Sequence, residues 1–173
     1  MNDQNIILVL RLLHIVCGVF WAGSVFHFAL FLIPAAKASG PEGVKFMQQL
    51  GKTGYPIVIM IAAMITILTG VLLIWKLSEG FHSAWFHSPY SKVLTAGSGM
   101  AIIAFIIGFT VNRPAGMRMN KISDAIAKTR GAPTNEQLQE LLALRNKLFT
   151  ATKYIAFLLV LAVISMSICR YVG

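Results

Sequence analysis

Four long stretches of the chain consist almost entirely of apolar residues, and most polar residues lie between them. The stretches cover about residues 6–32, 57–77, 93–111 and 148–171. A helix needs roughly 17 to 25 mainly apolar residues to cross a bilayer, and all four stretches reach that length. The pattern therefore predicts an all-α integral membrane protein, a single domain in which four transmembrane helices form a bundle.

Composition points the same way. Of the 173 residues, 57% are hydrophobic and 12% are charged, whereas charged residues make up about 25% of a soluble domain. The first apolar stretch is too long for the core of a cleaved signal peptide, and no basic segment precedes it. We therefore expect the first helix to remain in the mature protein.

Basic residues predict the orientation of the bundle. Ten lysines and arginines lie in the two connections at residues 35–54 and 113–147. The positive-inside rule places these connections in the cytoplasm, which puts both termini on the periplasmic side. The net charge of +9 is explained by lysines and arginines near anionic lipid, so the lipid bilayer is the expected partner and nucleic acid is not.

The connections carry helical signals of their own. Residues 41–50 predict a short interfacial helix, and residues 117–129 predict an amphipathic continuation of the third helix beyond a disturbance at Pro114. Thr134 and Gln137 have the spacing of a capping box that starts the fourth helix. Helices three and four should thus project as a cytoplasmic helical hairpin. On the outer side, residues 78–91 hold His82 and His87 among aromatic residues, as expected of a belt at headgroup level.

The first apolar stretch contains ionisable side chains, which are costly in hydrocarbon and often functional. His14 and His27 lie roughly 20 Å apart along a helix and point in different directions. Gly18 follows His14 by one turn and Gly23 precedes His27 by one turn, so a flat ligand or another helix can approach closely. An imidazole beside such a surface suits an axial haem ligand. An interhelical hydrogen bond is the open alternative for each histidine.

Other candidate ligands are scarce, since the second, third and fourth stretches contain no histidine. A second axial ligand would be a methionine or a histidine from another copy of the chain, which makes a homodimer an expectation. Lys92 opens the third stretch on the same side as His14, and either it snorkels to headgroups or it meets a carboxylate. Cys17 and Cys169 both fall in the outer half, as free thiols or as a disulfide.

Short motifs resemble a known family. Residues 12–23 fit the first-helix pattern Leu-His-x-x-x-x-x-x-Trp-x-Gly shared by HemJ-type protoporphyrinogen oxidases and copper-resistance D (CopD) type membrane proteins. Residues 90–94, Tyr-Ser-Lys-Val-Leu, are similar to the lysine-containing start of the third helix in that group. Residues 166–171 resemble the Met-Ala-x-x-Arg-Tyr ending of bacterial relatives that share the connection Gly-x-Pro-Thr-x-Glu-Gln.

The resemblance implies a bacterial inner-membrane protein with four helices that binds haem b and uses a first-helix histidine and a third-helix lysine, here His14 and Lys92. Oxidation of protoporphyrinogen is implied by resemblance alone. We expect a haem or porphyrin site in which Gly18 and Trp21 shape the pocket, while Lys92 or Arg11 engages a propionate. The redox partner is unknown.

The alternative class is a cofactor-free membrane helper or small transporter subunit, including copper-related transport. Its histidines would only join helices. The sequence has no methionine-rich or histidine-rich periplasmic cluster for copper. His14 and His27 are the candidate metal ligands.

Overall fold

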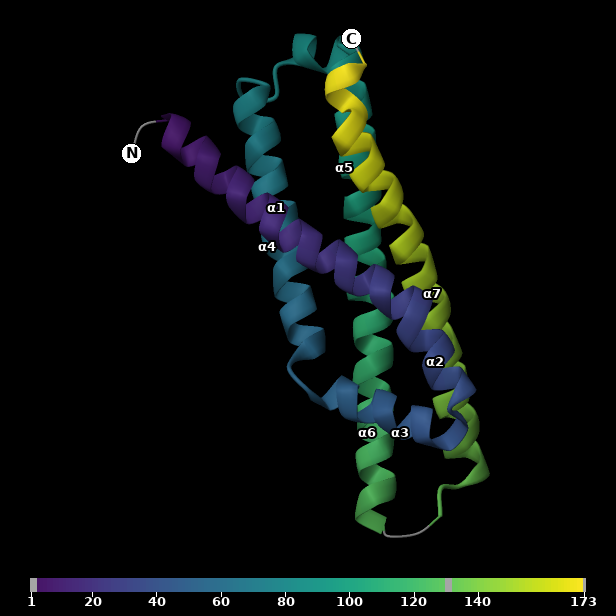
Figure 1. Ribbon diagram of the computed structural model, residues 1–173. Coiled ribbons are helices and arrows are strands. Elements are labelled where there is room, and N and C mark those ends of the chain that lie inside the picture. Colours follow the sequence, from purple (N-terminus) through teal and green to yellow (C-terminus); the bar gives the residue numbers. More distant parts are fainter. Residues whose placement is uncertain (1–2, 130–131, 173) are drawn as a thin grey trace.

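The computed structural model describes residues 3–129 and 132–172, and within these ranges every regular element is helical. Four helical runs are long and apolar enough to cross a membrane: Asp3–Ala38, Tyr55–Leu77, Pro89–Thr129 and Asn135–Tyr171 (Figure 1). Each run contains one of the four stretches expected from the hydrophobic pattern. The expected all-α fold with four helices able to span a membrane is therefore confirmed.

The first and third runs are divided by π-helical turns. In chain order the elements are α1 (Asp3–His27), the π turn η1 (Phe28–Leu32), α2 (Ile33–Ala38), α3 (Gly40–Lys52), α4 (Tyr55–Leu77), the 3-10 turn η2 (Ser83–His87), α5 (Pro89–Ile107), the π turn η3 (Gly108–Asn112), α6 (Arg113–Thr129), α7 (Asn135–Ile168) and the 3-10 turn η4 (Cys169–Tyr171).

Local sequence explains where α5 and α7 begin. The Thr134 hydroxyl accepts a hydrogen bond from the Gln137 backbone N–H at 3.2 Å, and the Gln137 side chain accepts one from the Thr134 N–H at 3.0 Å. The predicted capping box is thus confirmed. At the start of α5, the Ser88 hydroxyl accepts from the Ser91 N–H, and Pro89 occupies the first turn, where its missing N–H costs nothing.

The predicted disturbance at Pro114 takes a specific form. The helix does not break there: η3 ends at Asn112 and α6 continues from Arg113. Proline has no N–H to donate to the preceding turn. A π turn holds one extra residue and rearranges the neighbouring hydrogen bonds, which lets the chain continue as a helix.

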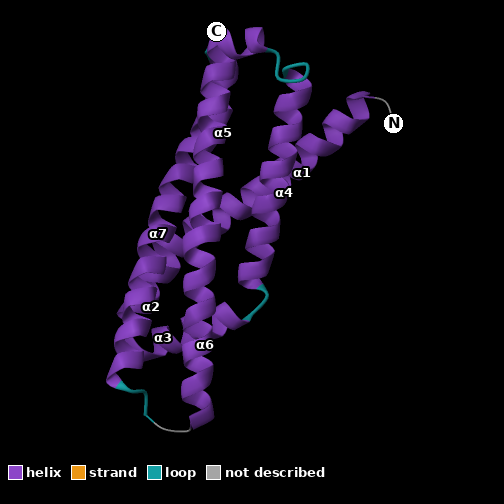
Figure 2. Ribbon diagram, turned by 180° about the vertical axis from the view of Figure 1, so that it is seen from behind, coloured by secondary structure: helices purple, strands orange, loops and turns teal. Residues whose placement is uncertain are grey.

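The long helices pack as two pairs, α1 with α4 and α5 with α7. The pairs meet mainly where the later part of α1 reaches α7 (Figures 1 and 2). Small residues dominate the shared core, which lets the helix backbones approach closely. The core cluster consists of Trp21, Val25, Ala29, Ala62, Ala63, Ala101, Ala104, Ile155, Ala156, Leu159 and Ala162.

The beginning of α1 crosses α4 obliquely and leaves the rest of the bundle (Figure 1). Leu8, Leu12 and Val19 are 61–69% exposed, so this stretch offers an apolar surface to the membrane. Asp3 pairs with Lys76 at 3.0 Å, which ties the first turn of α1 to the end of α4. Both described ends of the chain lie at the same end of the bundle as η2.

At the opposite end, α3 lies against α4 and α6, as a slightly longer helix than the one predicted at residues 41–50. Lys52 pairs with Asp124 of α6 at 2.6 Å. α6 in turn packs on the first part of α7, where Arg118 pairs with Glu140. Cys17 and Cys169 are both free thiols, which decides between the two alternatives left open for them.

Candidate functional site

His14 lies at the crossing of α1 and α4 and joins the two helices. Its Nδ1 is 2.9 Å from the backbone carbonyl oxygen of Thr66 and 3.3 Å from the hydroxyl of Thr69. The Thr69 hydroxyl itself donates to the Ile65 carbonyl at 2.6 Å, so its oxygen is left to accept. Nδ1 of the imidazole therefore anchors His14 to α4.

This anchoring determines where the protons of the imidazole lie. A carbonyl oxygen only accepts hydrogen bonds, so Nδ1 of His14 must carry the proton that the Thr66 carbonyl receives. In the neutral ring, Nε2 then keeps its lone pair. Nε2 has no hydrogen-bond partner within the described ranges, yet it is not among their buried unpaired atoms. It is therefore not completely buried.

The α4 side of the crossing is built from a stripe of small and hydroxyl residues. Thr66, Thr69 and Gly70 have the i, i+3, i+4 spacing of one helix face. The Thr66 hydroxyl donates a hydrogen bond to the Ala62 carbonyl within α4 at 2.7 Å. A Cβ atom at Gly70 would be 2.9 Å from Cε1 of His14. Only glycine leaves room for the ring at this position.

Gly18 and Trp21 take part in helix packing. A Cβ at Gly18 would lie 3.4 Å from Cγ2 of Thr66, so the flat surface of Gly18 faces α4. Trp21 is 4% exposed and belongs to the core cluster, with Cys17 packed against that cluster. The expected face of α1 that holds His14, Gly18 and Trp21 is thus the face turned toward the rest of the bundle.

The two candidate cations remain at the surface. Arg11 and Lys92 are both exposed, and neither forms an ion pair within the described part of the chain. Arg11 lies one turn before His14 on the same helix. Lys92 lies in the first turn of α5, whose main packing partner is α7, and it makes no hydrogen bond to His14. The structure does not join Lys92 to the crossing of α1 and α4.

His27 lies at the end of α1, directly before η1, and is exposed. Its ring is 5.4 Å from the ring of Phe31. It has no hydrogen bond to the described residues. His14 and His27 are therefore separate groups, as the helical spacing predicted.

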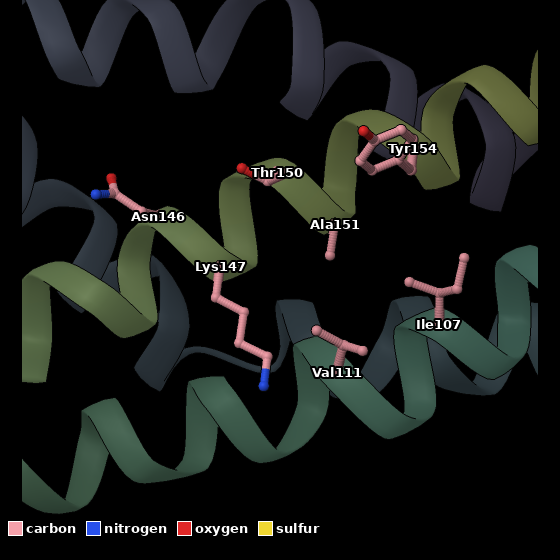
Figure 3. Close-up of a pocket in the computed structure, with 7 residues that line it drawn as sticks. All are labelled: Ile107, Val111, Asn146, Lys147, Thr150, Ala151 and Tyr154. Atoms are coloured by element: carbon pink, nitrogen blue, oxygen red, sulfur yellow. The ribbon is translucent and has the colours of Figure 1, made fainter.

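Neither a metal cluster nor an enclosing cavity forms around these residues. Within residues 3–129 and 132–172, no three histidine, cysteine, aspartate or glutamate residues gather in a way that could hold an ion. A hollow of about 450 Å³ lies between the third helical run and α7 (Figure 3), and a second, of about 240 Å³, lies at Trp75, Lys76, Glu79 and Gly80. His14 lines neither hollow.

Sequence reasoning did not name Thr66, Thr69 and Gly70 as partners of His14. The signal was present: two hydroxyls and a glycine share one face of an otherwise apolar helix. Such stripes commonly mark close helix contacts in membranes, but the stripe does not say which helix it meets. Comparison of the chain with protein-family models, with curated proteins and with solved structures finds no match.

Proposed function

We propose that this protein binds haem b, or another porphyrin, through Nε2 of His14 and has a redox or porphyrin-linked role in a bacterial inner membrane. The supporting observation is the bond between Nδ1 of His14 and the Thr66 carbonyl. Histidines that ligate metals commonly donate their second ring N–H to a backbone carbonyl or carboxylate, which orients the ring and leaves the other nitrogen as ligand. His14 has this arrangement.

The donor chemistry fits a haem with one protein ligand from this chain. Imidazole is a common axial ligand of haem iron, and a bound haem would supply one-electron chemistry. His14 is half-buried, and its Nε2 is not among the buried unpaired atoms of the described residues. No cluster of histidine, cysteine, aspartate or glutamate side chains surrounds His14 in the described structure, so a second ligand would be a methionine or a histidine from a second copy of the chain. A homodimer follows as part of the proposal.

The surrounding residues would orient the group. Arg11, one turn from His14 and free of ion pairs in the described structure, is the cation nearest in sequence for a carboxylate. Thr69 and Gly70 would keep the imidazole fixed against α4. Lys92, at the same end of the bundle, would serve the carboxylate only if a second copy or a movement of α5 brings it there.

The proposed topology places three elements in the cytoplasm. α6 and the first turns of α7 form the helical hairpin, and α3 lies beside it. Both termini then lie in the periplasm. The basic residues of these elements support this orientation by the positive-inside rule.

The cofactor-free reading, a membrane helper or small transporter subunit, has its own supporting observation. The bond from His14 to α4 is also what a histidine that only joins helices would make. Such bonds contribute on average about 0.6 kcal/mol in a membrane protein. This reading predicts that His14 affects stability alone.

The test is the visible absorption spectrum and haem content of protein purified in mild detergent from haem-supplemented cells. We expect a Soret band, and α and β bands after reduction with dithionite. His14→Ala should lose the bound haem while its expression and helical content are retained. His27→Ala is the matched control on the same helix, and it should keep the haem.

Two results would contradict the proposal. A flat spectrum in the unmodified protein, with no haem bound on titration, would favour the cofactor-free reading. Unchanged haem content in His14→Ala would refute the ligand assignment.

Loss of haem in both histidine variants would point to a dimer with His14 and His27 from different copies, which size-exclusion chromatography with light scattering would detect.

A further inference from the structure

The larger hollow is lined by residues of other helices than the one that carries His14, and it has a distinct chemistry. It opens between the end of α5 with η3 and the first half of α7 (Figure 3). Ile107 and Val111 line one wall and Ala151 faces them from α7, so the floor is apolar. Asn146, Lys147, Thr150 and Tyr154 complete the lining on the α7 side. The hollow thus combines an apolar floor with a cation and hydroxyl groups.

The π turn is a structural reason for the hollow. The hydrogen bonds of η3 run from residue i to residue i+5, and this alters the spacing of side chains along the helix. Asn112, its last residue, donates from Nδ2 to the Thr152 hydroxyl at 3.0 Å, and this bond holds the turn against α7. Next to Thr152, Ala151 is too small to fill the space opposite Val111. The hollow therefore lies beside a hydrogen-bonded contact between η3 and α7.

The polar groups of the hollow are free to bind a ligand. Lys147 has no carboxylate within 4.0 Å among the residues that the structure describes. Glu140, two turns earlier on α7, is already paired with Arg118, so it does not neutralise this lysine. The hydroxyls of Thr150 and Tyr154 also make no hydrogen bond within the described ranges, and Tyr154 is 64% exposed.

The groups are ordered along α7. Lys147 lies at the margin of the fourth apolar segment, Thr150 and Ala151 lie one turn deeper, and Tyr154 lies about 10 Å from Lys147 along the axis. In Figure 3 the Lys147 side chain extends from α7 toward the facing helix, on the same side as Val111 and Ile107. A ligand that follows this order has its anionic group at the membrane margin and its apolar part in the hydrocarbon.

We propose that this hollow binds an acidic phospholipid, with the phosphate at Lys147 and an acyl chain along Ile107, Val111 and Ala151. The positive charge of Lys147, which has no carboxylate partner among the described residues, favours an acidic lipid over a zwitterionic one. Basic sites between transmembrane helices bind anionic headgroups in this way. The apolar floor selects a lipid over a free phosphate ester. This site is independent of the haem proposal, since none of its residues contacts His14.

The test measures lipid binding by native mass spectrometry of the intact chain in detergent. The probes are phosphatidylglycerol and phosphatidylcholine with identical acyl chains, and glycerol phosphate serves as a chain-free competitor. We expect tighter binding of phosphatidylglycerol and no competition by glycerol phosphate at equal concentration. Lys147→Gln should weaken phosphatidylglycerol binding about fivefold, as expected for one lysine near an anionic group, and leave phosphatidylcholine unchanged.

Two further variants make the test specific to the hollow. Lys153→Gln removes another exposed lysine of α7 that does not line the hollow, and it should change the affinity less than twofold. Val111→Phe fills the hollow without altering charge and should weaken both lipids. Equal binding of the two lipids by the unmodified protein would overturn the proposal. Equal losses in the two lysine variants would do the same, because they would show attraction to general surface charge.

Discussion

The imidazole of His14 occupies the space that a side chain at position 70 would need. A Cβ at Gly70 would be 2.9 Å from Cε1 and 3.3 Å from Nδ1 of His14, so the glycine and the histidine are sterically complementary. The same contact brings Nδ1 within reach of the Thr66 carbonyl. Gly70, together with Gly18, therefore contributes to the close approach of α1 and α4.

Gly70→Ala should displace the His14 ring from α4. We expect the variant to lose about 1–3 kcal/mol of stability, the usual cost of overpacking, measured by thermal unfolding in detergent with circular dichroism. If His14 holds haem, the haem content should fall as well. Gly99→Ala is the matched control, because a Cβ there has no neighbour within 4 Å. Equal melting temperatures in the two variants would show that the ring has room to move.

The fold and the site around His14 differ in how far the sequence could predict them. The four spans follow from the thickness of hydrocarbon, which sets a minimum length that the sequence shows directly. The capping box at Thr134 is equally local, since both of its hydrogen bonds lie within three residues. The site is different. His14 was identified as an unusual residue, but its partners lie 52 and 55 residues away.

The pairing of helices could not be predicted for a physical reason. Transmembrane helices are apolar on all sides, so a hydrophobic pattern does not distinguish the face that meets protein from the face that meets lipid. Contacts such as that of Gly97 with α7 depend on small side chains, whose importance becomes visible only when the partner is known. The π turn before Pro114 is likewise a choice among hydrogen-bond arrangements that the sequence leaves open.

Gly97 allows the close approach of α5 and α7. A Cβ at this position would lie 2.9 Å from the Ser165 Cβ and 3.1 Å from the Ala162 carbonyl oxygen. Gly97→Ala should therefore separate the pair and lower stability by about 1–3 kcal/mol, measured by the same thermal unfolding. Gly99→Ala, two residues away, is again the control. Adding Ser165→Gly should restore only part of the loss, because the backbone carbonyl remains; full recovery would assign the clash to Ser165 alone.

Gly43 allows α3 to fold back against α2. A Cβ there would lie 2.7 Å from the Ala36 Cα and would also meet the Ala36 carbonyl. Backbone atoms cannot yield as a flexible side chain does, so Gly43→Ala should open this corner. We expect faster hydrogen exchange of the amides at residues 40–52, measured by mass spectrometry, with little change in α5. Gly54→Ala, whose Cβ would have no neighbour within 4 Å, should leave the exchange unchanged. Similar protection in both variants would mean that the corner can widen without loss of α3.

The pair between Arg118 and Glu140 predicts an acid-dependent contact between α6 and α7. Nε and a terminal nitrogen of Arg118 donate to the two carboxylate oxygens of Glu140 at 2.7 and 3.1 Å. These hydrogen bonds, and to a lesser degree the charge of Arg118, lower the pKa of Glu140 below its usual value of 4.5.

The sign of the pH dependence follows from that direction. A carboxyl group with a lowered pKa in the folded state stabilises the fold above its unfolded pKa, and the contribution is lost as pH falls through the folded pKa. The melting temperature should therefore be higher in the unmodified protein than in Glu140→Gln at neutral pH, by a small amount because the pair is exposed and screened by salt. The difference should begin to shrink as the pH falls below about 4.5 and vanish once the pH lies below the lowered pKa of Glu140 in the folded state. Glu136→Gln, which removes a carboxylate on the same helix that has no ion pair in the described structure, should show no such convergence. A difference between the unmodified protein and Glu140→Gln that persists in acid would mean that Glu140 contributes through packing and not through its charge.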